Sequence, residues 1–317
     1  MIPRAPDSLL RYLPYLMVLF LGTIWGITFS LARLATEAGA HPLGLAFWQA
    51  AGGGVVMLIW CFLSRLRPLF RSSMLGPYIV IGLLGTALPG TILFYAAPHV
   101  PAGVLAITIA LVPMLTYAAT WLLKIDELSM TRILGVLLGF VAILLVMLPA
   151  TSLPDQSMQG WLLLALLAVC FYTGENLYVD MVIPVETDMA LLLLGAMFAA
   201  ACLLLPLVLQ QDAFVTVWLP FDVIDWSIIC MSLVSSLAYL LYLKVIQSSG
   251  AVFASMAGYV ITLSGVFWGI VFFAEAHSAW IWSALILMLI GMALVTPREK
   301  AHGKPATNDT KEEENLT

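Results

Sequence analysis

Long runs of apolar residues dominate the chain, and they lack the strict alternation of apolar and polar positions that a surface strand shows. A run of about 20 apolar residues is long enough to cross a bilayer as a helix. Strands of a membrane barrel would instead alternate lipid-facing and lumen-facing residues. The pattern therefore predicts an all-α integral membrane protein with ten transmembrane helices. The expected helices cover residues 13–35, 43–63, 76–97, 101–123, 131–149, 160–181, 189–209, 226–246, 251–274 and 279–296.

The composition leads to the same class of protein. Hydrophobic residues make up 62% of the chain and charged residues only 10%, which is too little polar material to cover a soluble globule. The first apolar run is longer than the core of a signal peptide, so we expect it to stay as the first helix. The four cysteines lie in apolar segments without CxxC spacing, and we interpret them as packing residues.

The distribution of positive charge predicts the orientation in the membrane. If the N-terminus is cytoplasmic, all of the 13 Lys and Arg residues except Arg33 fall on the cytoplasmic side. Positive residues are retained on that side during insertion. We therefore expect a multi-pass protein of the cell (inner) membrane with both termini cytoplasmic. Residues 298–317 are polar and charged, and we expect them to form a disordered cytoplasmic tail.

The chain contains an internal repeat. Residues 102–146 align with residues 250–294 at a constant offset of 148, which places Glu127 on Glu275. The expected repeats are residues 1–150 and 158–297, with five helices each. Because five is odd, the second repeat enters the membrane inverted relative to the first. Inverted repeats are the construction of many secondary transporters, which bind substrate near the midplane between the repeats.

Small residues and prolines indicate how the helices pack and bend. GxxxG spacing occurs at Gly22 and Gly26, and again in residues 135–139 and 265–269. This spacing lets two helix backbones approach closely, although chance matches are frequent in membrane helices. Pro89 and Pro113 lie inside expected helices, where each predicts a static bend or, alternatively, a hinge.

Glu175 is the first candidate for a functional residue. It lies well inside the apolar segment 160–181, and a carboxylate within a bilayer costs several kcal/mol unless it faces water, a partner or a substrate. The alternative is a structural acid that reaches the headgroups, which is what we expect of Asp180. Lys244 is also expected to reach the headgroups, with an ion pair to Glu175 or Asp180 as the alternative.

Several classes of function lack support. The sequence contains no P-loop for ATP and no HExxH metal motif, so we expect neither a cofactor nor a metal. No GxSxG motif or second mid-membrane carboxylate supports an intramembrane hydrolase. We therefore predict that the protein is not an enzyme. The expected partners are a small-molecule substrate and membrane lipids, without nucleic acid, and the expected state is a monomer or weak homodimer.

Two stretches resemble a known family. Leu-Gly-Thr-Ile-Trp-Gly-Ile-Thr-Phe at 21–29 resembles the Trp-Gly-x-x-Phe signature of the EamA type in the drug/metabolite transporter superfamily. Leu-Lys-Ile-Asp-Glu at 123–127 resembles its Glu motif, which is repeated around Glu275. The resemblance covers residues 14–297 and implies a secondary carrier of amino acids, other small metabolites or toxic compounds. The chain departs from the family at Gln49, where Arg is frequent, and at Thr28, where Asn is frequent.

The resemblance also implies a cavity formed mainly by the first, third, fourth, sixth, eighth and ninth helices. Polar and aromatic side chains at mid-depth of these helices, together with Gln49, are our candidates for substrate binding. Each aromatic residue alone has packing as its alternative role. Phe94 and Ser255 also lie at mid-depth of these helices. The candidates are Trp25, Thr28, Gln49, Tyr95, Thr108, Tyr172, Glu175, Asn176, Tyr239, Tyr242, Tyr259 and Thr262.

Together these observations predict a secondary active transporter, an exporter or exchanger that moves a small polar metabolite such as an amino acid or amine by alternating access. Glu175 is the candidate for binding an amine or exchanging the coupling proton. The alternatives are a channel or a scaffold that does not transport, and, with less support, the intramembrane hydrolase.

Overall fold

The computed structural model describes residues 7–66, 72–149 and 151–295, and within these ranges the regular structure is helical. The expected tail, residues 298–317, lies outside the described residues. The helices of the first half are α1 (Asp7–Trp25), α2 (Ile27–Glu37), α3 (Pro42–Leu63), η1 (Ser72–Met74), α4 (Leu75–Gly82), the π-helical turn η2 (Leu83–Ala87), α5 (Leu88–Ala96), α6 (Ala102–Ile109), α7 (Val112–Leu122) and α8 (Met130–Met147). Those of the second half are α9 (Met158–Val182), α10 (Met189–Gln210), α11 (Val223–Ser249), α12 (Ala251–Ser255), α13 (Ala257–Phe273) and α14 (Ala279–Val295).

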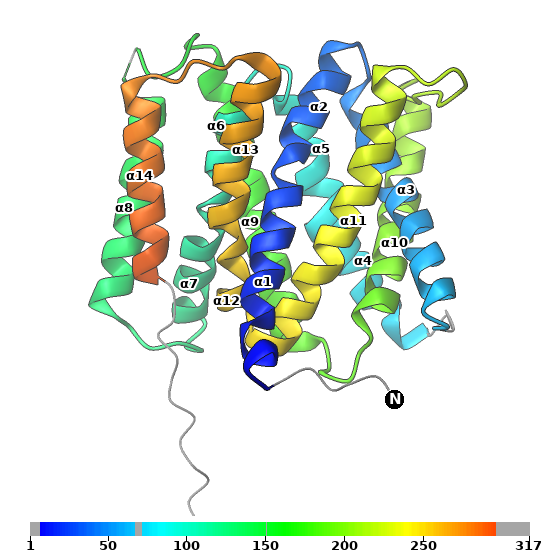
Figure 1. The fold of residues 1–317 in the computed structure, drawn as a ribbon, viewed down its shortest axis with the longest axis horizontal. Helices are drawn as coiled ribbons and strands as arrows, with labels where there is room; N and C mark the ends of the chain where they lie inside the picture. The colour runs from blue at the N-terminus through cyan, green and yellow to red at the C-terminus, as the bar shows by residue number, and fades with distance from the viewer. Residues whose placement is uncertain (1–6, 67–71, 150, 296–317) are drawn as a thin grey trace, which may run out of the picture.

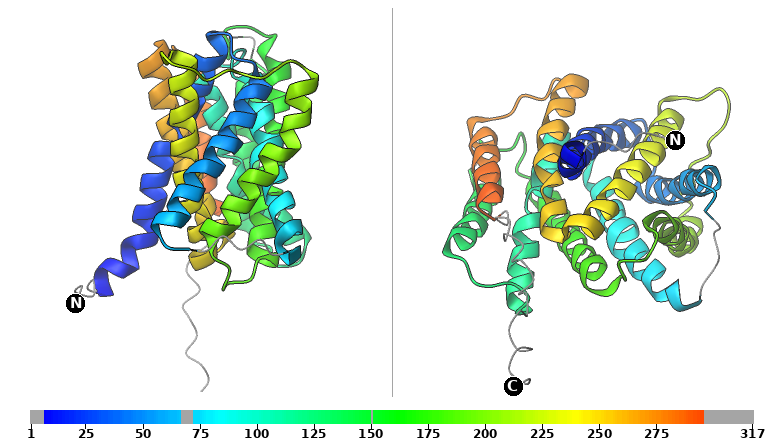
Figure 2. Two further views of the ribbon diagram at one scale, coloured as in Figure 1. Left: turned by 90° about the vertical axis from the view of Figure 1, so that its right-hand side faces the viewer. Right: turned by 60° about the horizontal axis from the view of Figure 1, so that its bottom comes forward.

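The described helices form ten membrane-crossing units, as the apolar runs predict. Nine units are long and apolar enough to span a bilayer, and α14 is a shorter apolar helix of 17 residues. Four units consist of consecutive helical segments: α1 with α2, α4 with η2 and α5, α6 with α7, and α12 with α13. The first described turn of α1 and the end of α14 lie at the same face (Figure 1). We name the opposite face, which comprises residues 38–41, 97–101, 151–157, 211–222 and 274–278, the Glu275 face (Figures 1 and 2).

Helices of one half pack against helices of the other half, and these pairings are reciprocal. In the first half α1 packs against α11 and α13, and in the second half α9 packs against α5 and α7. Three further pairs each join equivalent helices of the two halves: α3 with α10, α6 with α13, and α8 with α14. Every residue of α6 is buried, so this helix lies at the centre of the bundle. This reciprocal packing is the arrangement expected of two inverted five-helix repeats.

Helix breaks occur both at prolines and elsewhere. Pro89 and Pro113 each lie in the first turn of a new helical segment, α5 and α7, as the sequence predicts. Pro206, by contrast, lies inside the continuous helix α10. The first crossing unit breaks at Gly26 and the ninth at Met256 without a proline. A missing backbone donor therefore accounts for some of the bends, and a glycine marks the one at Gly26.

The glycines of the three GxxxG sequences face neighbouring helices at close range, so the prediction of close packing is confirmed. A Cβ atom at Gly22 would lie 2.5 Å from the Val260 side chain, and one at Gly135 would lie 2.5 Å from the Gly291 carbonyl oxygen. A Cβ atom at Gly269 would lie 3.1 Å from the backbone nitrogen of Gly103. These glycines therefore let α1 approach α13, α8 approach α14, and α13 approach α6.

We expect Gly135→Ala to destabilise the protein by about 1–3 kcal/mol, because the added methyl group meets the rigid backbone of α14. The matched control is Gly160→Ala near the start of α9, where an added Cβ has no neighbour within 4 Å. That control should be neutral or slightly stabilising, because alanine favours a helix over glycine. Thermal unfolding of the purified protein checks this, and equal melting temperatures for the two variants would contradict the close contact.

Candidate functional site

The site lies between the two halves and contains two cavities. The first, of about 60 Å³, is named here the Glu175 cavity. Its walls come from the first half and from α9, α11, α12 and α13 of the second. The lining residues are Trp25, Phe29, Gly85, Ile109, Val112, Tyr172, Glu175, Asn176, Tyr239, Tyr242, Ser255, Gly258 and Ile261.

The second cavity, of about 50 Å³, is named the Gln49 cavity. Trp25, Phe29 and Tyr172 line both cavities, so the two spaces are neighbours that share these aromatic side chains. The other residues of the Gln49 cavity are mostly apolar. They are Thr28, Ala32, Gln49, Gly90, Leu93, Phe94, Ala97 and Leu105.

The Glu175 carboxyl group is buried in the middle of the bundle. The residue is only 2% exposed, and its Oε1 accepts a hydrogen bond from the hydroxyl group of Tyr239 on α11. The space for this contact depends on Gly85 in the π-helical turn η2. A Cβ atom at Gly85 would lie 2.5 Å from the Glu175 carboxyl carbon and would also overlap the Tyr239 hydroxyl group. Single π-helical turns inside α-helices occur frequently at functional sites.

Asn176 adds a second polar group to the same cavity. Tyr242 donates a hydrogen bond of 3.0 Å to Asn176 Oδ1, while Asn176 Nδ2 is buried without a hydrogen-bond partner. The Trp25 ring lies 5.9 Å from the Tyr239 ring and 5.7 Å from the Tyr242 ring, centroid to centroid. The carboxyl and amide groups are therefore surrounded by aromatic rings.

Gln49 connects the two halves at the second cavity. Its Nε2 donates to the hydroxyl group of Ser235 on α11 at 2.9 Å, so the side chain bridges α3 and α11. Its Oε1 faces Gly90, where a Cβ atom would lie 3.3 Å away. The Thr28 hydroxyl group on α2 donates to the carbonyl oxygen of Trp25, the last residue of α1, at 2.7 Å. Gln49 thus both bridges two helices and lines the cavity.

Most of the sequence-predicted candidates come together. Trp25, Thr28, Gln49, Tyr172, Glu175, Asn176, Tyr239 and Tyr242 all line one or both cavities, as do Phe94 and Ser255.

Four candidates line neither cavity, which corrects their expected position. Thr108 donates to the Leu105 carbonyl oxygen of its own helix, and Thr262 donates to the Ala106 carbonyl oxygen of α6. A threonine in a membrane helix often satisfies its hydroxyl group on a backbone carbonyl. Tyr95 packs its ring against that of His41, 5.9 Å away. Tyr259 on α13 is only partly buried and also lies outside both linings.

Several lining residues are absent from the candidates predicted from the sequence. Phe29 has a signal, because it ends the Trp-Gly-x-x-Phe sequence of the first helix. Gly85 has none, because its importance depends on the π-helical turn. Ile109, Val112 and Ile261 are apolar residues in apolar helices, and only the three-dimensional packing distinguishes them from lipid-facing neighbours.

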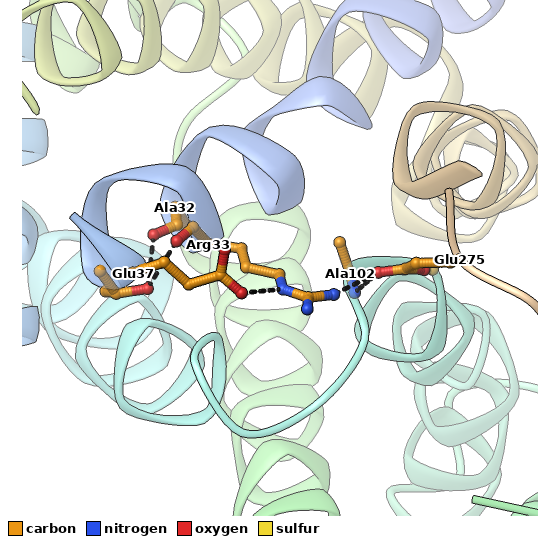
Figure 3. Close-up of polar contacts among 7 residues, drawn as sticks. Ala32, Arg33, Glu37, Ala102 and Glu275 are labelled. Atoms are coloured by element: carbon orange, nitrogen blue, oxygen red, sulfur yellow. Dashed lines mark hydrogen bonds and ion pairs between the residues drawn. The ribbon is translucent and has the colours of Figure 1, made fainter. Parts of the chain in front are cut away.

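A group of charges around the buried Glu275 lies at the Glu275 face, and we name it the Glu275 cluster (Figure 3). Arg33 pairs with Glu37 through Nε and with Glu275 Oε1 through Nη1, both at 2.7 Å. The Glu275 carboxylate also accepts hydrogen bonds from the backbone nitrogens of Ala102 at 2.7 Å and Gly103 at 3.1 Å, at the start of α6. A carboxylate at a helix N-terminus is favoured by the helix dipole and by the free N–H groups.

The cluster ties the halves together at this face. It joins α2 and α6 of the first half to the α13–α14 loop of the second half, with the Glu275 side chain only 5% exposed. His277 Nε2 lies 3.4 Å from Glu275 Oε2. Burial lowers the pKa of His277 from its ordinary value, and the Glu275 carboxylate opposes this shift. Arg33 and Glu275 were each noted in the sequence, but nothing there indicated that they pair.

Lys244 contacts neither acid of α9 among the ion pairs of the described residues. Its ammonium group lies 5.9 Å from the centre of the Trp60 ring, and the residue is exposed. The expected snorkelling position fits this contact, and the alternative ion pair to Glu175 or Asp180 does not form.

Many transporters are built from inverted repeats with a substrate site near the centre of the helical bundle, between the repeats. The EamA-like transporter family matches the chain twice, over residues 13–148 and 159–296, and the chain belongs to this family. A solved structure described only as "Crystal structure of protein" superposes with a TM-score of 0.60 at 16% identity, covering 88% of this chain and 98% of that one. That likeness concerns the fold alone. No curated protein matches the sequence.

Proposed function

We propose that the protein is a secondary active transporter, an exporter or exchanger, that carries a small polar metabolite such as an amino acid or amine across the cell (inner) membrane. In this proposal both termini are cytoplasmic. The observation that carries the proposal is the position of Glu175, which is 2% exposed and lines an aromatic cavity between the two halves.

The chemistry of a buried carboxylate supports coupled transport. An ionised carboxylate without a counter-ion is costly in a membrane interior, so the group must hold either a proton or a cationic substrate. Because both occupants use the same oxygens, binding of one releases the other. This competition is the minimal requirement for exchanging a proton against a cation.

The asymmetry between the faces supports alternating access. At the Glu275 face the Glu275 carboxylate is buried in the cluster, whereas its repeat-related residue Glu127 is exposed at the other face. We propose on this basis that the described state is closed at the Glu275 face. We propose residues 1–150 and 158–297 as the two bodies that rock against each other around the cavities.

Counterflow in proteoliposomes tests the proposal. Vesicles that contain the purified protein and unlabelled metabolite inside should accumulate the labelled form of that metabolite transiently, because a carrier is accelerated by substrate on the opposite side. Candidate metabolites come from a thermal-shift screen, since binding to the native state raises the melting temperature.

A channel would equilibrate the label without any stimulation by internal metabolite. Cleavage of the metabolite, detected by product analysis, would instead indicate the hydrolase. Either result would contradict the proposed carrier function.

A further inference from the structure

The charges around the two cavities are of one sign. Glu175 is the only acid among the lining residues, and the described lining contains no Lys, Arg or His. The nearest cation along α2, Arg33, is already paired with Glu37 and Glu275. The site thus provides a partner for a cationic nitrogen and none for an anionic group.

Aromatic rings strengthen this preference for a cation. Trp25, Tyr172, Tyr239 and Tyr242 line the cavity around Glu175, and the Trp25 ring lies within 6 Å of two of the other rings. The faces of such rings attract ammonium groups, most strongly where water is excluded.

One hydrogen-bond donor next to the acid is free. Asn176 Nδ2 is buried without a partner, and Asn176 follows Glu175 directly on α9. Two other side-chain donors of the lining are engaged, since Gln49 Nε2 bonds Ser235 and the Thr28 hydroxyl group bonds the Trp25 carbonyl oxygen. A buried donor without a partner is unfavourable, so an acceptor atom from a ligand has a clear place to bind.

The Gln49 cavity accepts a different part of a ligand. Leu93, Phe94 and Leu105 provide apolar walls, and the cavity shares the Trp25 and Tyr172 side chains with the Glu175 cavity. An apolar side group attached to the amine can therefore extend into it.

We propose that the substrate is a small protonated amine that carries an acceptor oxygen near the nitrogen, a short apolar group and no carboxylate. The nitrogen binds Glu175 inside the aromatic rings, the oxygen accepts from Asn176 Nδ2, and the apolar group occupies the Gln49 cavity. This inference rests on the proposed transport function and narrows its substrate class to amines rather than amino acids. A free carboxylate would be buried here without a cation, which is costly.

Three matched probes test this substrate class: leucine, leucinamide and 3-methylbutylamine, which share one apolar group. Below about pH 7 the amino groups of all three are protonated. Only leucinamide combines the cation with a neutral acceptor oxygen. Calorimetry on the purified protein should rank leucinamide first, with roughly tenfold weaker binding of 3-methylbutylamine and weaker binding still of leucine.

Two variants separate the oxygen contact from general damage to the site. Asn176→Leu should reduce the preference for leucinamide over 3-methylbutylamine to about one, because it removes the free donor at similar volume. Tyr242→Phe removes the hydroxyl partner of Asn176 Oδ1 but leaves Nδ2, so the preference should persist.

The outcomes distinguish the two proposals. Stronger binding of leucine than of leucinamide, or no binding of any probe, would overturn the substrate class, while counterflow with another metabolite would still support a carrier. Binding of leucinamide in the expected order without trans-stimulated exchange would support the site and contradict the transport function. A preference for leucinamide that survives in Asn176→Leu would overturn the assignment of the oxygen contact.

Discussion

Replacing Glu175 with glutamine is expected to reduce exchange of a cationic substrate at least about 100-fold and to remove its dependence on pH. Glutamine has nearly the same volume and still accepts the hydrogen bond from Tyr239, but it carries no charge and takes up no proton. The substrate nitrogen then enters the cavity without its counter-ion. Because breaking a buried ion pair costs about 3–5 kcal/mol, the effect on exchange is large.

The measurement is the rate of counterflow in proteoliposomes over a range of pH, with the amount of folded protein checked by thermal unfolding. Glu186→Gln is the matched control, because Glu186 is an exposed acid in the loop after α9. That control should transport at the normal rate. Unchanged exchange by Glu175→Gln at every pH would remove the residue from the mechanism, even if the protein remains a carrier.

The ten crossing units were predictable because the bilayer imposes a minimum apolar length, which can be read directly from the sequence. The offset of 148 residues between the repeats also agrees with the positions at which equivalent helices begin. It places Met130 at the start of α8 opposite residue 278, one residue before α14 begins at Ala279. Within the site, Glu175 was identifiable because a lone acid in an apolar helix is costly.

The remainder of the site depends on contacts that leave no local signal. Arg33 and Glu275 are 242 residues apart, and their pairing follows only from the way the halves meet. Thr108 and Tyr172 are both mid-depth polar residues, yet one bonds its own backbone and the other lines a cavity. The rotation of each helix about its own axis decides whether a side chain faces a cavity or a neighbouring helix. Rotation depends on contacts with neighbouring helices, and periodicity carries little information where nearly every position is apolar.

Replacing Glu275 with glutamine is expected to open the Glu275 face and to lower the melting temperature. The carboxylate holds the Arg33 guanidinium and two backbone N–H groups at the start of α6, and hydrogen bonds to a charged group are worth about 1.5–3 kcal/mol each. Glutamine retains part of this bonding but not the charge. The closed state therefore loses the part of this stabilisation that depends on the charge. States open at the Glu275 face then become more populated.

A cysteine at Ala97 reports the opening, because this residue lines the Gln49 cavity close to the Glu275 face and is 1% exposed. In protein without its native cysteines and held in nanodiscs, labelling of Ala97→Cys by a polar maleimide should accelerate at least about tenfold when Glu275→Gln is added. Glu127→Gln is the matched control at the repeat-related position. Glu127 is exposed, so its neutralisation should leave the labelling rate unchanged.

Arg33→Gln tests whether the ion pair itself holds the face closed. If it does, Arg33→Gln should accelerate labelling on its own, and the double variant with Glu275→Gln should label less rapidly than the product of the two single effects predicts, because both remove one shared interaction. Independent, multiplicative effects would mean that the two residues act separately. Slow labelling in all three variants would show that helix packing alone closes this face, and the cluster would then have no part in alternating access.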